Sequence, residues 1–227
     1  MMSLEELKAR LESELENLHL EIIPNAAPGG EASLLVPSTC IYRVGRYLHD
    51  AEDLQFDYLS NVSGVDWLDR EVTEKVKVTR TVTKEVEGVS TQVEETVEEV
   101  QKQLVPGYLE VVYHLYSVPF KQGPLVLRAR TANRSDQVDI PSVVAIWRSA
   151  EYQEREVFDL YGVNFTRHPD LRRLLMWPEF KDFPMRRDYV EPDDFDYEPT
   201  ATGELLKKAE AHRAAAEAAA EGKEESR

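Results

Sequence analysis

Hydrophobic residues recur with helical spacing at the start of the chain. Leucine occupies positions 4, 7, 11, 15 and 18, and these intervals place all of them on one helical face. Ser3 and Glu6 have the spacing of a capping box, in which each side chain accepts a hydrogen bond from the other residue's backbone N–H. We therefore predict a helix over residues 3–20 that ends before Pro24, and a second helix over residues 41–53.

Runs of β-branched, aromatic and aliphatic residues predict strands over residues 32–36, 56–67, 108–118 and 124–131. A segment of a different kind, residues 69–107, separates the middle two of these strands. It consists almost entirely of Val, Thr, Glu and Lys. Its position between two predicted strands indicates an insertion into the domain.

The valines of this insertion alternate along the chain. Those at 76, 78, 82 and 86 share one parity and those at 89, 93 and 97 share the other, on either side of a turn candidate at Glu87–Gly88. This pattern predicts a long β-hairpin ribbon with one apolar stripe. Helical spacing also fits the second half of the insertion, but the β-branched residues favour the hairpin.

The remaining elements predict an α+β fold. A helical run is expected from Asp139 to Tyr161, and Gly162 stands where a glycine ends a helix. The order of elements indicates a two-layer α+β core domain over residues 1–165, with a mixed sheet and helices on one face. An extended C-terminal arm, residues 166–199, and an Ala/Glu-rich tail that is helical or disordered, residues 200–227, complete the chain.

Composition excludes several classes of protein. The 227 residues carry 27 basic and 43 acidic side chains, a formal net charge of −16, which argues against a nucleic-acid partner. A single cysteine excludes an iron–sulfur or zinc site made only of cysteines. Because no segment approaches the length of a membrane-spanning helix, we expect any membrane association to be made through a partner.

Candidate chemistry is concentrated in residues 154–189, and the usual phosphate-binding, nucleophile and zinc motifs are missing. One interpretation is an acid–base set made of Glu154, Glu156, Asp159 and His168. A helix, however, separates the two glutamates by about 200°, and Arg155 is expected to form an ion pair with Asp159 four residues on. A structural role is therefore favoured, and a stand-alone acid–base hydrolase is the alternative.

The following segment has the composition of a protein interface. His168-Pro169-Asp170 predicts a turn and the start of a helix, with His168 interpreted as a buried or interface histidine bonded to backbone rather than a metal ligand. Aromatic residues and methionine alternate with basic residues over 167–189, as in the centres of interfaces. The basic residues are Arg167, Arg172, Arg173, Lys181, Arg186 and Arg187.

The same block resembles the signature of the 30-kDa-type subunit of respiratory complex I, which in bacteria is the C subunit of NADH:quinone oxidoreductase. The resemblance covers residues 32–68 and 108–190, with 69–107 as an insertion. The motif runs as ERExxDLYGxxFxxHPDLRRLL from Glu154 and continues as PMRRDY to Tyr189. The matching residues are Glu154, Arg155, Glu156, Asp159, Gly162, His168, Pro169, Asp170, Arg172, Arg173, Arg186, Arg187, Asp188 and Tyr189.

The resemblance implies a non-catalytic structural subunit of the peripheral arm of a proton-translocating NADH:quinone oxidoreductase, at the cytoplasmic face of the bacterial inner membrane. It implies no catalytic, metal or cofactor site in this chain, with iron–sulfur clusters and FMN in partner subunits. The implied partners are the quinone-site D subunit and the cluster-bearing B subunit. Two alternatives are a subunit of a related membrane-bound hydrogenase or other dehydrogenase, and a homo-oligomeric module joined by ribbon edges.

Overall fold

The computed structural model describes the backbone of residues 2–27, 30–86 and 89–190, and the side chains of these residues outside 74–101. By its internal contacts the chain divides into two compact units, Met1–Arg187 and Asp188–Arg227. The predicted turn at Glu87–Gly88, residues 191–199 of the predicted C-terminal arm and the predicted tail lie outside the described residues.

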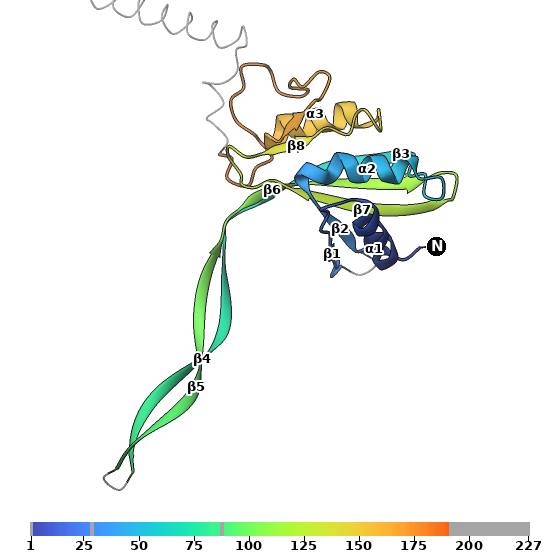
Figure 1. Cartoon of the computed structure of the whole chain (residues 1–227). Helices are drawn as coiled ribbons and strands as arrows, with labels where there is room; N and C mark the ends of the chain where they lie inside the picture. Colours follow the sequence, from blue (N-terminus) through green and yellow to red (C-terminus); the bar gives the residue numbers. More distant parts are fainter. Residues whose placement is uncertain (1, 28–29, 87–88, 191–227) are drawn as a thin grey trace, which may run out of the picture. The chain divides into compact units, whose positions relative to one another are not determined.

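A mixed five-stranded sheet forms the centre of the first unit (Figure 1). Its strand order is β1-β2-β7-β6-β3; β2 and β7 run parallel, and the other neighbours are antiparallel. The predicted α+β class with a mixed sheet is therefore confirmed, although β1 was not predicted. The strands are β1 (Glu21–Ile23), β2 (Ser33–Pro37), β3 (Tyr58–Trp67), β6 (Tyr108–Ser117) and β7 (Gln122–Arg130).

Among the described residues, three α-helices accompany the sheet: α1 (Leu4–Glu14), α2 (Ile41–Asp50) and α3 (Ala150–Tyr161). The prediction of a helix over residues 3–20 is wrong beyond Glu14, because the helix ends there and Leu15 has an extended backbone. A 3-10 turn, η1 (Ser38–Cys40), leads into α2. The predicted capping box is confirmed at α1, because the Glu6 N–H donates to Ser3 Oγ at 3.1 Å and the Ser3 N–H donates to the Glu6 carboxylate at 2.7 Å. These bonds satisfy two of the N–H groups that a helix start leaves without partners.

The prediction of one helix from Asp139 to Tyr161 is wrong in its first half. Residues 139–141 form strand β8 (Asp139–Pro141), which pairs in parallel with β9 (Asn164–Thr166). Ile140 lies opposite Phe165, and both side chains are buried. The partner strand β9 follows α3 in the sequence. The free energy gained by burying this pair outweighs the local preference for a helix.

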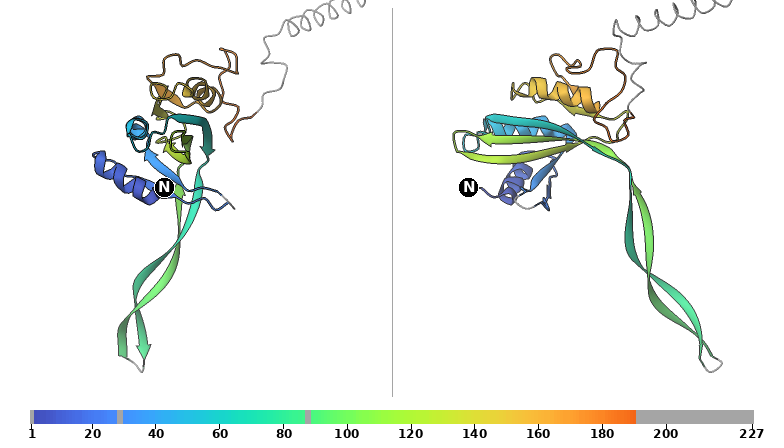
Figure 2. Two further views of the ribbon diagram at one scale, coloured as in Figure 1. Left: turned by 90° about the vertical axis from the view of Figure 1, so that its right-hand side faces the viewer. Right: turned by 180° about the vertical axis from the view of Figure 1, so that it is seen from behind.

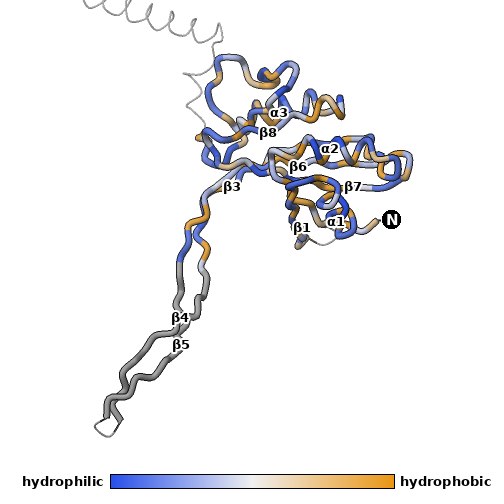
Figure 3. The backbone as a smooth tube through the Cα atoms, viewed as in Figure 1, coloured by the Kyte–Doolittle hydropathy of each residue, from blue (hydrophilic) through white to orange (hydrophobic). Residues whose placement is uncertain are grey.

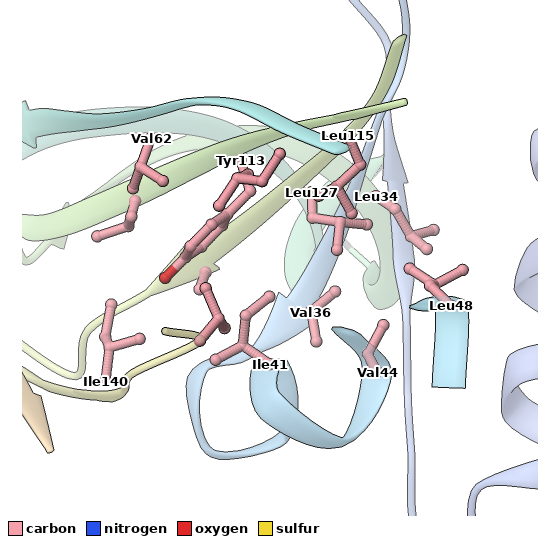
Figure 4. Packing of buried hydrophobic residues seen from close by; sticks show 14 of the residues in the cluster. Leu34, Val36, Ile41, Val44, Leu48, Val62, Tyr113, Leu115, Leu127 and Ile140 are labelled. Atoms are coloured by element: carbon pink, nitrogen blue, oxygen red, sulfur yellow. The ribbon is translucent and has the colours of Figure 1, made fainter. Parts of the chain in front are cut away.

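One continuous hydrophobic cluster joins the sheet to the helices. Alternate residues of β6, from Leu109 through Tyr113 to Leu115, are buried on the same side of the sheet. All three α-helices add buried side chains to this cluster. Figure 2 shows the helices against the sheet in two further views, Figure 3 shows the apolar segments in both layers, and Figure 4 shows their packing.

The opposite side of the sheet contains a buried charged group that the sequence did not predict. The Glu110 side chain is fully buried there and accepts hydrogen bonds from Arg128 Nη2, from Arg130 Nε at 2.9 Å and from Trp67 Nε1 at 3.1 Å. The guanidinium of Arg130 also lies over the Tyr108 ring, 4.8 Å from its centroid. A buried carboxylate requires such compensation, because its desolvation is costly.

Strands β4 (Arg70–Val86) and β5 (Val89–Val105) pair as an antiparallel ribbon, which is inserted in the sequence between β3 and β6. The register places Val78 opposite Val97 and Val82 opposite Val93. At the base of the ribbon the Gly107 N–H donates to Asp69 Oδ1 at 2.6 Å.

Candidate functional site

Helix α3 places the charged residues of the candidate site on different sides. Glu154, Arg155 and Asp159 are buried, whereas Glu156 is exposed. The predicted separation of Glu154 from Glu156 is therefore confirmed. Helix α3 also packs closely on β3, where a Cβ atom added to Gly64 would come within 2.4 Å of the Tyr161 ring.

The Asp159 carboxylate holds the start of the C-terminal arm by its backbone. Oδ2 accepts hydrogen bonds from the N–H groups of Leu174, Leu175 and Met176 at 2.9, 2.6 and 2.8 Å. Arg173 Nη1 donates to Oδ1 at 2.7 Å. Burial alone would raise the pKa of Asp159, but these donors together outweigh it and lower the pKa below its usual value. The carboxylate is therefore ionised at neutral pH.

The predicted Arg155–Asp159 ion pair is wrong. Asp159 forms its ion pair with Arg173 instead. Arg155 donates from Nε to the carbonyl oxygen of Arg172 at 3.1 Å and from Nη2 to that of Arg173 at 3.3 Å. The charged side chains of α3 bond to an irregular segment instead of to each other. The backbone N–H and C=O groups of that segment are not paired within a helix or sheet, so they need side-chain partners.

Farther along, the C-terminal arm is attached at the end of α3. The Met185 N–H donates to the carbonyl oxygen of Leu160 at 3.1 Å, and Arg186 Nε donates to that of Tyr161 at 2.7 Å. The Arg187 N–H donates to Asp66 Oδ2 at 2.8 Å. Strand β3, which carries Asp66, therefore helps α3 to hold this segment.

Asp66 is itself fixed by a second contact. Arg134 donates to both of its carboxylate oxygens, from Nε at 2.6 Å and from Nη2 at 2.7 Å. Burial acts to raise the pKa of Asp66, but the hydrogen bonds from Arg134 and from the Arg187 N–H outweigh it and lower the pKa. This carboxylate is thus a fixed, ionised acceptor for the arm.

Gly162 ends α3 as the sequence predicts. Its backbone is left-handed, with φ 77°, and its N–H donates to the carbonyl oxygen of Phe158 at 2.9 Å. A Cβ atom at this position would meet the Phe183 ring at 2.6 Å and Arg186 Nη2 at 2.8 Å. Glycine is therefore required both by the backbone conformation and by the close approach of the arm.

His168 confirms one prediction and corrects another. Its Nε2 lies 3.0 Å from the carbonyl oxygen of Glu151, and the Asp170 N–H donates to Nδ1 at 3.1 Å, so the ring is bonded to backbone as expected. The predicted helix start at Pro169–Asp170 is wrong, because a turn there leads into irregular backbone. The N–H groups of residues 174–176 bond to Asp159, which removes the donors that a helix would use.

The same segment exposes apolar side chains. Leu174, Leu175 and Met185 are 36%, 59% and 53% exposed, and the Arg172 side chain, paired with Asp170 at 2.9 Å, is 72% exposed. Trp177 and Phe180 pack edge to face, with ring centroids 4.9 Å apart. Exposed apolar side chains beside an accessible arginine have the composition of a protein-docking surface, and here they stand on a backbone that α3 holds in place.

The geometry does not favour the acid–base interpretation. The Glu154 and His168 side chains are both 0% exposed and lie 4.0 Å apart at their nearest N and O atoms. A substrate has no access to them without local opening of the structure. Among the described residues, no group of three or more His, Cys, Asp or Glu side chains could hold a metal ion, and no helix is long and apolar enough to cross a bilayer.

Comparisons with known proteins agree with this structure. Residues 34–194 match the family model described as "Respiratory-chain NADH dehydrogenase, 30 Kd subunit". The NADH-quinone oxidoreductase C subunit 2 of Rhizobium etli is 34% identical over 155 residues, which span 68% of this chain and 62% of that protein. The NADH-quinone oxidoreductase C/D subunit of Phocaeicola vulgatus is 45% identical over 83 residues, 37% of this chain and 16% of that protein.

The fold is also found among solved structures. A chain of an archaeal membrane-bound sulfane sulfur reductase matches with a TM-score of 0.52 at 20% identity, over 82% of this chain and 85% of that one. The family model covers the sheet from β2 onward, without β1, and it also covers α3 and the arm residues that α3 and β3 hold. The chain therefore belongs to the family of 30-kDa subunits of respiratory-chain NADH dehydrogenase.

Proposed function

We propose that this chain is a non-catalytic structural subunit of the peripheral arm of a proton-translocating NADH:quinone oxidoreductase, and that its C-terminal arm docks on the quinone-site D subunit. One observation carries the proposal: α3 fixes the backbone of the arm, while Leu174, Leu175 and Met185 remain exposed. A surface whose backbone is already ordered loses less conformational entropy when a partner covers it.

Two further observations support the quinone-site subunit as the partner. The name of the relative from Phocaeicola vulgatus joins the C and D subunits in one protein, as expected of subunits that are neighbours in a complex. The exposed Arg172 can pair with a carboxylate of the partner, and such pairs fix orientation at an interface. The cluster-bearing B subunit is the second partner that we propose.

In this role the chain transfers no electrons itself. Iron–sulfur clusters and FMN in partner subunits would carry electrons from NADH to the quinone, and this protein would hold the quinone-site subunit in place. The complex would place the chain at the cytoplasmic face of the bacterial inner membrane. Subunits of related membrane-bound hydrogenases or dehydrogenases are the alternative, because the shared fold also occurs in a sulfane sulfur reductase.

The test compares two exposed apolar residues at different places in the first unit. Leu175 lies in the arm and is 59% exposed, while Val118 follows β6 and is 61% exposed. Tagged wild type, Leu175→Glu and Val118→Glu would be recovered from mildly solubilised membranes. Co-purified iron–sulfur signal and NADH:quinone activity should fall about tenfold or more only for Leu175→Glu, because a central interface contact contributes about 2 kcal/mol or more.

Three other results would change the conclusion. Equal recovery with Leu175→Glu and wild type would exclude the arm as the docking surface. If iron–sulfur clusters co-purify with wild type but accept no electrons from NADH, a subunit of a related membrane-bound hydrogenase or dehydrogenase would be favoured. A wild-type chain recovered without partners would favour a stand-alone protein.

A further inference from the structure

The core of the first unit contains a buried carboxyl group that the docking surface does not use. Glu154 is 0% exposed and lies beneath the start of the C-terminal arm. Its Oε1 accepts a hydrogen bond from the Val143 N–H at 2.8 Å, and Oε2 lies 2.6 Å from Ser142 Oγ. Both partners follow β8, so this one side chain connects α3 with the segment between β8 and the helix.

His168 encloses the same carboxyl group from the side of the arm. Its Nε2 is 4.0 Å from Glu154 Oε2, and its side chain is also 0% exposed. The ring has a defined neutral form, because Nδ1 accepts the Asp170 N–H and Nε2 therefore donates to the carbonyl oxygen of Glu151. A neutral His168 offers Glu154 no compensating charge.

Tyr113 is a further titratable side chain close enough to Glu154 to be affected by its charge. It comes from β6, and its hydroxyl is buried with no hydrogen-bond partner among those residues. Burial, and next the nearby Glu154 carboxylate, raise the pKa of Tyr113, so it remains neutral. Figure 4 shows its hydroxyl on the side of the core where Val62 and Ile140 lie. An ionised Glu154 would thus meet polar but uncharged neighbours.

We propose that Glu154, enclosed by the His168 ring, is a buried site that binds one proton, and that loss of this proton loosens the start of the C-terminal arm from α3. With the proton present, the enclosed pair carries no net charge. Without it, a carboxylate remains beside a neutral imidazole, out of contact with water. Opening of the arm at His168 would let water reach the carboxylate, so ionisation favours the open form.

The direction of the pH effect follows from the same environment. Burial raises the pKa of Glu154 to about 7, against the opposing hydrogen bonds from Ser142 and Val143. A group whose pKa is raised in the closed form stabilises that form below its ordinary pKa, and this stabilisation is lost as the pH rises through about 7. The ratio of open to closed arm should increase about tenfold between pH 6 and pH 8, since Glu154 regains an ordinary pKa on opening.

The experiment uses the full-length chain and trypsin, which cleaves the arm after Arg167 and Arg172 once it opens. Rates would be measured at pH 6, 7 and 8 for wild type, Glu154→Gln and Glu156→Gln. Because trypsin itself depends on pH, the wild-type rate is divided by the Glu154→Gln rate at each pH. We expect this ratio to rise about tenfold over the range, and Glu156→Gln, altered at an exposed residue of the same helix, to follow wild type.

A constant ratio of wild type to Glu154→Gln would overturn the proposal. A second variant covers the case in which Glu154→Gln does not fold. Ser142→Ala removes one hydrogen bond that favours the ionised carboxylate, so the transition should move to higher pH. The midpoint would be followed by the carbon-13 NMR signal of the Glu154 carboxyl group, and an unchanged midpoint in Ser142→Ala would also overturn the proposal.

Discussion

Arg173 bonds to Asp159 twice, because its Nη1 donates to the side-chain Oδ1 at 2.7 Å and to the backbone carbonyl oxygen at 3.1 Å. The same guanidinium donates from Nη2 to the carbonyl oxygen of Asp182 at 3.2 Å. One side chain therefore connects α3 to two points of the arm that are nine residues apart. The family motif contains two adjacent arginines, and the structure gives them different surroundings.

Substitution of Arg172 is expected to affect assembly of the complex, whereas substitution of Arg173 is expected to affect stability of the arm. Arg172→Glu should leave stability within about 0.5 kcal/mol, because its side chain is exposed, but should lower recovery of the assembled complex. Arg173→Lys should weaken the arm by about 1–2 kcal/mol, since lysine cannot reproduce the forked contact. Hydrogen exchange of residues 174–176 and membrane pull-down measure the two effects. Faster exchange in Arg172→Glu than in Arg173→Lys would contradict this assignment.

Asp159→Asn tests the carboxylate that holds residues 174–176. The amide is nearly isosteric but uncharged, and its NH₂ group cannot accept hydrogen bonds from backbone N–H groups. Loss of one partner of a buried ion pair costs about 3–5 kcal/mol, so hydrogen exchange of Leu175 and Met176 should accelerate strongly. Glu156→Gln on the same helix is the control, since its side chain is exposed.

Acid should reproduce part of this effect. The pKa of Asp159 is lowered in the folded chain, so its stabilising contribution is complete above the ordinary carboxyl pKa and is lost as the pH falls through the lowered value. Exchange of residues 174–176 should therefore accelerate below about pH 4 in wild type. If Asp159→Asn shows the same increase over this range, another group is responsible.

Glu110→Gln should destabilise the sheet by about 3–5 kcal/mol, because two arginines would lose the buried carboxylate that compensates them. Urea unfolding followed by tryptophan fluorescence measures this effect, and Trp67 itself bonds to Glu110. Glu71→Gln is the matched control: its side chain is 64% exposed and its ion pair with Lys102 is at the surface, so the expected change is below about 0.5 kcal/mol. Equal midpoints for the two variants would contradict the structural role of Glu110.

Gly162→Ala should destabilise the junction between α3 and the arm. The left-handed backbone costs a residue with a Cβ atom about 1–2 kcal/mol, and the added carbon would also displace Phe183 or Arg186. The rate of tryptic cleavage of the arm should therefore rise clearly, while the free energy of global unfolding measured in urea should change less. Gly88→Ala, in the turn candidate of the insertion, should leave arm cleavage unaltered.

The helices and strands whose signals are local were predictable from the sequence. The leucine spacing and capping box of α1, the aromatic strands and Gly162 each follow from residues close in the chain. The β8–β9 pair was missed because its stability comes from residues on either side of α3. In the candidate site, the alternation of buried and exposed glutamates was predictable from helix geometry. The partners of Asp159 and Arg155 were not, because they lie on irregular backbone.

The contact between Asp159 and residues 174–176 has a consequence for how this surface can evolve. The carboxylate recognises only main-chain N–H groups, which every amino acid except proline provides. Side chains at these positions can therefore be exchanged to suit a changing partner without altering how the segment is fixed. The side chains can thus change with the partner while the backbone of the segment keeps its shape. Proline is the one replacement that is excluded, because it has no N–H group to donate to Asp159.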